Sequence, residues 1–182
     1  MQPEDCAMFS LDDLKIDLKR LNDGETLFTY SLDSSFFAAI DAPDVRKGTV
    51  VVSLAIHKTA ERYFELNFHI EGEVIVQCDR CLDDMTQAIE SDNRLMAKYG
   101  EEYSEDDDLV TVAEDEGILD VAWFIYEFID LSLPLKHVHA PGKCNVAMIK
   151  MLEEHSSTRS SDGDDKPVDP RWSGLEKLKN NI

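Results

Sequence analysis

The feature that most constrains the fold is a run of β-forming residues over 48–78, GTVVVSLAIHKTAERYFELNFHIEGEVIVQC. β-branched and aromatic residues dominate the run and alternate with polar ones, which is the period of strands that bury one face. We interpret KTAE and Gly72 as turns that interrupt it. The run therefore predicts three antiparallel strands in a meander, and the last of them ends at Cys78.

Shorter elements are predicted on both sides of this meander. Alternating apolar residues over 14–18, an NDG turn and the extended residues 27–32 predict an N-terminal hairpin. The other short elements are a helix and two strands, predicted over 33–40, 84–98 and 108–114.

The most apolar segment, LDVAWFIYEFIDLSL, has the spacing of one helix face. Asp120 is a candidate N-cap, and Pro134 should end the helix near residue 133. A sheet with one dry face needs an apolar cover, and this helix is the best one available. The predicted fold class is α+β, with a mainly antiparallel sheet from residues 12–113 covered by a helix over 120–133.

The C-terminal part of the chain differs in composition. Residues 156–168, SSTRSSDGDDKPV, are polar and aperiodic and predict a flexible linker between a single domain over 1–155 and a short amphipathic helix over 169–182. The helix is predicted because DPRWSGLEKLK starts with Asp and Pro at favoured N-terminal positions. Its candidate partner-binding residues are Arg171, Trp172, Leu175 and Leu178.

The chain is strongly acidic: its 182 residues include 38 acidic and 18 basic ones, for a formal net charge of −20. Phosphate recognition depends on clustered Lys and Arg, so direct RNA binding should be weak or absent, and a basic protein is the easier partner. Residues 101–120 concentrate carboxylates and contain no Lys or Arg. We interpret them as a solvated loop with a charged strand edge, and residues 101–116 could also steer a basic partner.

We expect a cytoplasmic protein. No apolar stretch approaches the roughly 18 residues of a membrane span, and the N-terminus lacks a basic and then apolar signal pattern. In that compartment four cysteines are too few for a disulfide scaffold. Cys6 is interpreted as a bystander.

The other three cysteines and two of the five histidines fall in two short segments, VQCDRCL and LPLKHVHAPGKCN. A structural zinc site needs four N or S ligands, usually as two short-spaced pairs that the fold brings together. Pro141 and Gly142 predict a turn in the second segment. The predicted zinc ligands are Cys78, Cys81, His139 and Cys144, with His137 as a reserve for His139.

Two other interpretations of these cysteines stay open. They could be small residues packed in the core. Cys78 and Cys81 could instead form a redox pair, although such pairs usually lie at a helix N-terminus, whereas this one follows a strand and encloses Asp79. The sequence contains no hydrolase, phosphate-loop, metalloprotease or dinucleotide signature, so we do not expect an enzyme.

Three motifs, in order, resemble the YceD family of large ribosomal RNA subunit accumulation proteins: CDRCL, GILDVAWFIYEFIDLSLPLKHVHAPGKC and DPRWSGLEKLK. The resemblance extends from about Leu14 to Lys179. It matches His139 and Cys144 to a His that follows Leu-Pro in the family pattern and to the Cys after it. Several relatives instead carry further cysteines downstream, and these are missing here. No catalytic residue is implied.

The resemblance implies a bacterial cytoplasmic factor needed for accumulation of large-subunit (23S) ribosomal RNA, often encoded beside a small protein of that subunit. Together with the acidic charge, it leads us to expect contacts with a basic ribosomal protein or a precursor particle. The alternatives are a C-x-x-C thiol redox protein and a zinc-stabilised scaffold unrelated to ribosomes.

Overall fold

The computed structural model describes residues 10–60, 62–106 and 109–156. The chain divides into two compact units, 1–149 and 150–182, and the sheets belong to the first. The described residues form a six-stranded sheet of order β2-β3-β4-β5-β7-β6 and a two-stranded sheet of β1 and β8. The predicted α+β class with a mainly antiparallel sheet is confirmed.

The strands of the large sheet are β2 (Glu25–Leu32), β3 (Lys47–Ala60), β4 (Tyr63–Gln77), β5 (Asp84–Gly100), β6 (Ser104–Asp106) and β7 (Leu109–Ala113). The small sheet consists of β1 (Lys15–Asp17) and β8 (Ile118–Asp120). The α-helices are α1 (Ser34–Ala39), α2 (Ala122–Leu131) and α3 (Val146–His155), and 3-10 turns form at Leu11–Leu14 and Leu18–Arg20. Every pair in the large sheet is antiparallel except β5 with β7, which is parallel.

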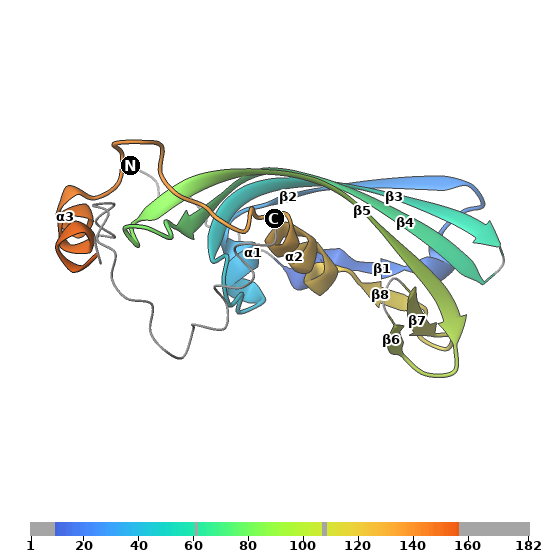
Figure 1. Cartoon of the computed structure of the whole chain (residues 1–182). Coiled ribbons are helices and arrows are strands. Elements are labelled where there is room, and N and C mark those ends of the chain that lie inside the picture. The colour runs from blue at the N-terminus through green and yellow to red at the C-terminus, as the bar shows by residue number, and fades with distance from the viewer. Residues whose placement is uncertain (1–9, 61, 107–108, 157–182) are drawn as a thin grey trace, which may run out of the picture. The chain divides into compact units, whose positions relative to one another are not determined.

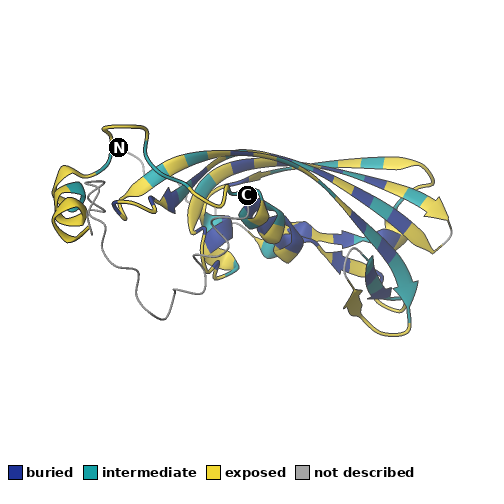
Figure 2. Ribbon diagram, viewed as in Figure 1, coloured by how far each residue is buried: buried dark blue, intermediate teal, exposed yellow. Residues whose placement is uncertain are grey.

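The large sheet buries one face and exposes the other. Buried and exposed residues alternate along β3 and β4, as the sequence period predicted (Figure 2). Helices α1 and α2 and the small sheet all lie on the same side of the curved large sheet (Figure 1). Phe68 of β4 packs edge-on against Phe128 of α2, with ring centroids 5.2 Å apart. The predicted cover of the sheet by the apolar helix is therefore confirmed.

Helix α2 begins and ends slightly inside the predicted range of 120–133. The N-cap residue is Val121 and not the predicted Asp120. The Asp120 carboxylate still accepts a hydrogen bond from the Ala122 N–H at 2.9 Å, so it satisfies one free donor of the first turn. The helix ends before Pro134, with Ser132 as its C-cap. No helix among the described residues is long and apolar enough to cross a membrane.

The predicted turn at Gly72 is wrong, because β4 continues through this residue as one strand of 15 residues. A Cβ atom at Gly72, where φ is +157°, would lie 2.3 Å from the Thr49 carbonyl oxygen and 2.7 Å from the Val50 Cα. Glycine is therefore needed here so that the backbones of β3 and β4 can approach, and not to reverse the chain. The run of 48–78 forms two strands instead of three.

The predicted N-terminal hairpin is also wrong. β1 pairs antiparallel with β8, where Ile16 lies opposite Leu119, and β2 pairs with β3. The Val121 N–H donates to the Leu14 carbonyl oxygen at 3.0 Å and extends this link. Leu14, Ile16 and Leu119 are all buried, so the N-terminal apolar residues pack with residues that lie much later in the sequence.

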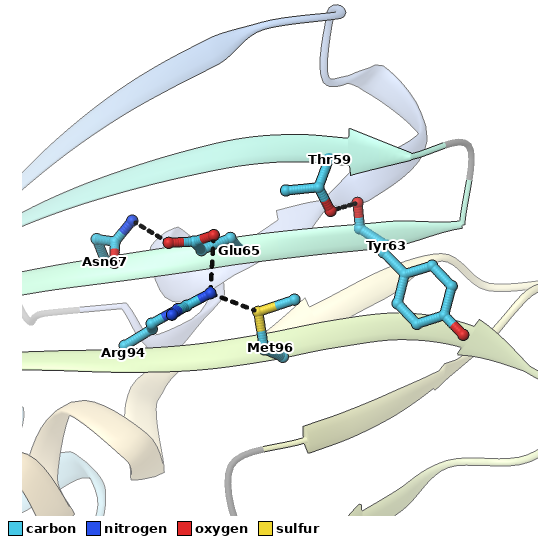
Figure 3. Close-up of polar contacts among 6 residues, drawn as sticks. All are labelled: Thr59, Tyr63, Glu65, Asn67, Arg94 and Met96. Atoms are coloured by element: carbon cyan, nitrogen blue, oxygen red, sulfur yellow. Dashed lines mark hydrogen bonds and ion pairs between the residues drawn. The ribbon is translucent and has the colours of Figure 1, made fainter.

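The exposed face of the large sheet is polar. Glu65 accepts hydrogen bonds from Asn67 Nδ2 at 3.3 Å and Arg94 Nη2 at 3.0 Å, and the same Arg94 nitrogen lies 3.7 Å from Met96 Sδ (Figure 3). The contact of Arg94 with Glu65 joins β5 to β4, and the other two lie within one strand; on the solvent side each adds little to stability.

Several predictions fall on residues that the structure does not describe. These are Cys6, residues 157–168 of the predicted linker, and the predicted helix over 169–182 with Arg171, Trp172, Leu175 and Leu178.

Candidate metal centre

The first ligand pair lies in a tight loop at the end of β4, residues 78–83, which we call the cysteine knuckle. The Cys78 N–H donates to the Asp83 carbonyl oxygen, and the Leu82 N–H donates to the Cys78 carbonyl oxygen, both at 2.9 Å. Leu82 adopts a φ of +62°, which favours glycine and is strained for leucine. The Cys78 and Cys81 side chains are both buried.

The second pair lies in residues 134–145, between α2 and α3, which we call the histidine loop. The predicted turn is present: the Lys143 N–H donates to the Ala140 carbonyl oxygen at 2.9 Å, and Gly142 has a φ of +80°. Asn145 ends the loop. Its Oδ1 accepts the Ala147 N–H at 3.0 Å at the start of α3, and its Nδ2 donates to Asp83 Oδ2 at 3.1 Å. Asn145 thereby joins the histidine loop to the knuckle.

Asp79 makes a second link between the two segments. Its N–H donates to the His137 carbonyl oxygen at 3.0 Å, and its Oδ2 accepts the His137 N–H at 2.8 Å. The His137 ring also turns toward this carboxylate, with Nε2 3.5 Å from Oδ1. His137, the reserve ligand, therefore contacts Asp79, and His139 is the histidine that lies beside the cysteines.

The four predicted ligands meet in one cluster. Their ligand atoms, from Cys78, Cys81, His139 and Cys144, all lie within 4.8 Å of one another. Cys78 Sγ is 3.9 Å from Cys144 Sγ, and Cys81 Sγ is 3.4 Å from His139 Nδ1. Tetrahedral zinc, with bonds of about 2.3 Å to sulfur and about 2.0 Å to nitrogen, separates such atoms by roughly 3.8 Å and 3.5 Å. The cluster is thus close enough to hold a metal ion, and its two measured distances suit zinc.

The electrostatics of the cluster also favour a cation. Burial raises the pKa of the Cys78 thiol, but hydrogen bonds from the backbones of His139, Arg80 and Cys81 outweigh it and lower the pKa from its ordinary 9.0 to about 6. Burial and the neighbouring sulfurs raise the pKa of Cys144 to about 11. A thiolate beside a half-buried thiol provides surroundings in which a bound metal ion displaces the proton of that thiol.

The structure also shows contacts that the sequence reasoning missed. In the sequence analysis Asp79 is treated only as a residue unsuited to a redox pair. Its two hydrogen bonds to the backbone of His137 give no sequence signal. Asn145 did carry one, since an Asn before the periodic segment VAMIKMLEEH is a typical helix start. The knuckle follows a strand and precedes another, so neither cysteine lies at a helix N-terminus.

Comparison with known proteins places the chain in a family. Residues 66–179 match the family described as Large ribosomal RNA subunit accumulation protein YceD. No curated protein and no solved structure was found to match the chain. The matched range contains both the cysteine knuckle and the histidine loop and extends over more than half of the sequence. The chain therefore belongs to the YceD family.

Proposed function

We propose that this protein is a non-enzymatic factor that supports accumulation of large-subunit (23S) ribosomal RNA in the bacterial cytoplasm. The observation that carries the proposal is the match of residues 66–179 to a family with this description. The net charge of −20 adds a constraint, because such a surface repels phosphates and attracts Lys and Arg. The partner is therefore a basic ribosomal protein or a precursor particle, and naked RNA binds weakly or not at all.

A strain that lacks the protein tests this role directly. We expect its 23S ribosomal RNA to fall relative to 16S, and the wild-type gene to restore it. In vitro, the protein should bind early large-subunit particles at physiological salt. Tight and specific binding to naked 23S fragments, undiminished when residues 169–182 are removed, would contradict a protein partner.

We also propose that the metal centre holds a structural zinc ion through Cys78, Cys81, His139 and Cys144. Four protein ligands leave no open position for water or substrate, so zinc would supply no catalysis. It would join the knuckle after β4 to the loop after α2 and thereby stabilise both. Protein purified without chelator should contain about one equivalent of zinc. Less than about a tenth of an equivalent, unchanged after refolding with zinc, would instead favour packed cysteines.

A thiol redox protein is the second candidate, because the Sγ atoms of Cys78 and Cys81 lie within 4.8 Å of each other. It predicts a reversible disulfide between them and rapid alkylation in the native state. A zinc centre predicts slow alkylation that a chelator accelerates. Measuring the alkylation rate with and without chelator separates the two functions.

The predicted C-terminal helix is a candidate contact with the partner, through Arg171, Trp172, Leu175 and Leu178. Removing residues 169–182 should weaken particle binding if the helix contributes.

A further inference from the structure

The two edges of the large sheet are built differently. At one edge, β6 has three exposed residues, two of them acidic, and such short charged edges resist pairing with other chains. At the other edge, β2 has eight residues, and its segment 26–32 contains neither a charge nor a proline. No described strand pairs with the outer side of β2, which borders only β3 (Figure 1). The β2 edge lacks the features that usually prevent strand addition.

The register shows which backbone groups face the open side of β2. The Lys58 N–H donates to the Gly24 carbonyl oxygen at 3.3 Å, so this pair is hydrogen bonded, and bonded pairs alternate along antiparallel strands. The even-numbered residues of β2 therefore bond to β3. The odd-numbered ones direct their N–H and C=O groups to the open edge, where no other described segment bonds to them. These outward residues are Glu25, Leu27, Thr29 and Ser31.

The side chains beside the open edge are suited to cover by another strand. On the inner face, Phe28 and Tyr30 are only half-buried and lie nearly parallel, with ring centroids 6.2 Å apart. On the outer face, the Leu27 side chain is 71% exposed. An added strand would cover apolar surface on both faces and bond to the free backbone groups.

We propose that β2 is a docking edge for an extended segment of a basic partner protein, which adds to the large sheet as a further strand. The inference rests on the proposed function and specifies how the basic partner binds. Charge selects the occupant, because a net charge of −20 repels a second copy of the chain. Carboxylates also flank the edge: Glu25 begins β2, Asp33 follows it, and the charge of Asp13 acts on Tyr30.

This arrangement predicts the sequence pattern of the docking segment. Its apolar residues face Phe28 and Tyr30, and the alternating residues are Lys or Arg on the solvent side, where the net negative charge of the protein attracts them. Backbone hydrogen bonds to the outward groups of β2 supply affinity, and the charges supply selectivity over acidic segments.

A blocked alternating lysine–valine peptide as long as β2 is the probe, titrated into the full chain at physiological salt. We expect binding that slows hydrogen exchange at Leu27, Thr29 and Ser31. Thr29→Pro removes an outward N–H and leaves the bonds to β3 intact, so it should weaken binding roughly tenfold or more. The matched variant Thr29→Val keeps the N–H and should bind like the wild type. Circular dichroism and zinc content establish that both variants are folded.

Leu27→Lys provides an independent check should Thr29→Pro fail to fold, since it adds a repelling charge at an exposed position and removes no backbone group. It should also weaken binding of the lysine–valine peptide. Equal binding to Thr29→Pro, or equal binding of a glutamate–valine peptide, would overturn the proposal. A dimer that Thr29→Pro dissociates would assign the edge to a second copy instead.

The test is separable from that of the proposed function. If the peptide fails to bind and 23S ribosomal RNA still falls in the deletion strain, the docking edge is wrong and the ribosomal role stands. If the peptide binds as expected and the deletion leaves 23S ribosomal RNA unchanged, the edge stands and its partner lies outside ribosome assembly.

Discussion

The core of the large sheet and the candidate metal centre are stabilised by different interactions. In β4, residues such as Phe64, Leu66 and Ile70 are fully buried, and their burial alone favours folding. The histidine loop is mostly exposed or half-buried, and Leu135 within it is fully exposed. A few hydrogen bonds and the ligand cluster join this loop to the sheet. From this comparison we expect the sheet to form without metal and the centre to depend on the proposed zinc ion.

The largest effect should come from the core itself. Phe68→Ala removes a ring that is 2% exposed and packs against α2, so we expect a loss of about 3–5 kcal/mol in the free energy of unfolding, measured with denaturant. The control Ser53→Ala, at an exposed position of β3, should change it by less than about 0.5 kcal/mol. A loss of under about 1 kcal/mol for Phe68→Ala would show that the core is not the main source of stability.

Cys78→Ser should affect only the centre. We expect loss of zinc and at least roughly tenfold faster amide exchange in residues 137–145, while amides of β3, β4 and β5 keep their protection. Cys6→Ser controls for the loss of a thiol and should retain the metal. If the sheet unfolds together with the centre, the two regions are one cooperative unit and the comparison fails.

Asp79→Ala tests whether the hydrogen bonds between the segments preorganise the ligands. The carboxylate is outside the ligand cluster, but it accepts the His137 N–H at 2.8 Å. Loss of such a supporting contact should lower zinc affinity roughly 10–100-fold, measured by competition with a chelator. Asp84→Asn, an exposed carboxyl nearby on β5, should leave the affinity unchanged. An unaltered zinc affinity in Asp79→Ala would show that the hydrogen bonds of Asp79 do not preorganise the ligands.

Leu82→Gly should slightly stabilise the zinc-loaded protein, by up to about 1 kcal/mol, because it relieves the strain of a left-handed leucine. Little burial is lost, since Leu82 is 61% exposed. Thermal unfolding of zinc-loaded protein measures the difference. A clear destabilisation would show that the leucine side chain makes a contact that the knuckle needs.

The smallest effect concerns the exposed face of the sheet. The hydrogen bond to Asp92, at 2.8 Å from His69 Nδ1, raises the pKa of His69 above its ordinary 6.5. The stabilisation is therefore fully present below pH 6.5 and is lost as the pH rises through the folded-state pKa. In Asp92→Asn, an NMR titration should find the pKa of His69 lowered toward 6.5. An unchanged pKa would assign the shift to the other carboxylates around His69.

The sequence predicted those elements that their own local residues determine. Helix α1 begins where Asp33 can cap it, and the apolar stripe of α2 marks that helix and the face it buries. Prediction failed where the partner is remote. Alternation over 14–18 indicates a strand but cannot tell whether it pairs with its neighbour β2 or with β8. Glycine is common both in turns and where two strands approach closely, and for Gly72 only the register with β3 distinguishes these cases.

The same distinction holds for the centre. Its four candidate ligands follow from chemistry and spacing, since Cys and His are scarce in the chain and fall in two short segments. The choice of His139 over His137 depends on the path of the loop past Asp79, which no local pattern encodes. The ten residues of α3 form a helix that the sequence analysis does not predict.

The pairing of β1 with β8 has a consequence for synthesis. Among the described strands, β1 is the first to leave the ribosome and β8 the last, and at roughly 5–20 residues per second about 5–20 seconds separate them. Throughout this interval Ile16 has no Leu119 opposite it, and Cys78 waits for Cys144 until after β8 has been made. A nascent chain that stops before residue 118 therefore keeps its N-terminal apolar residues in water, where chaperones and proteases recognise them. Completion of the domain and protection from degradation thus coincide.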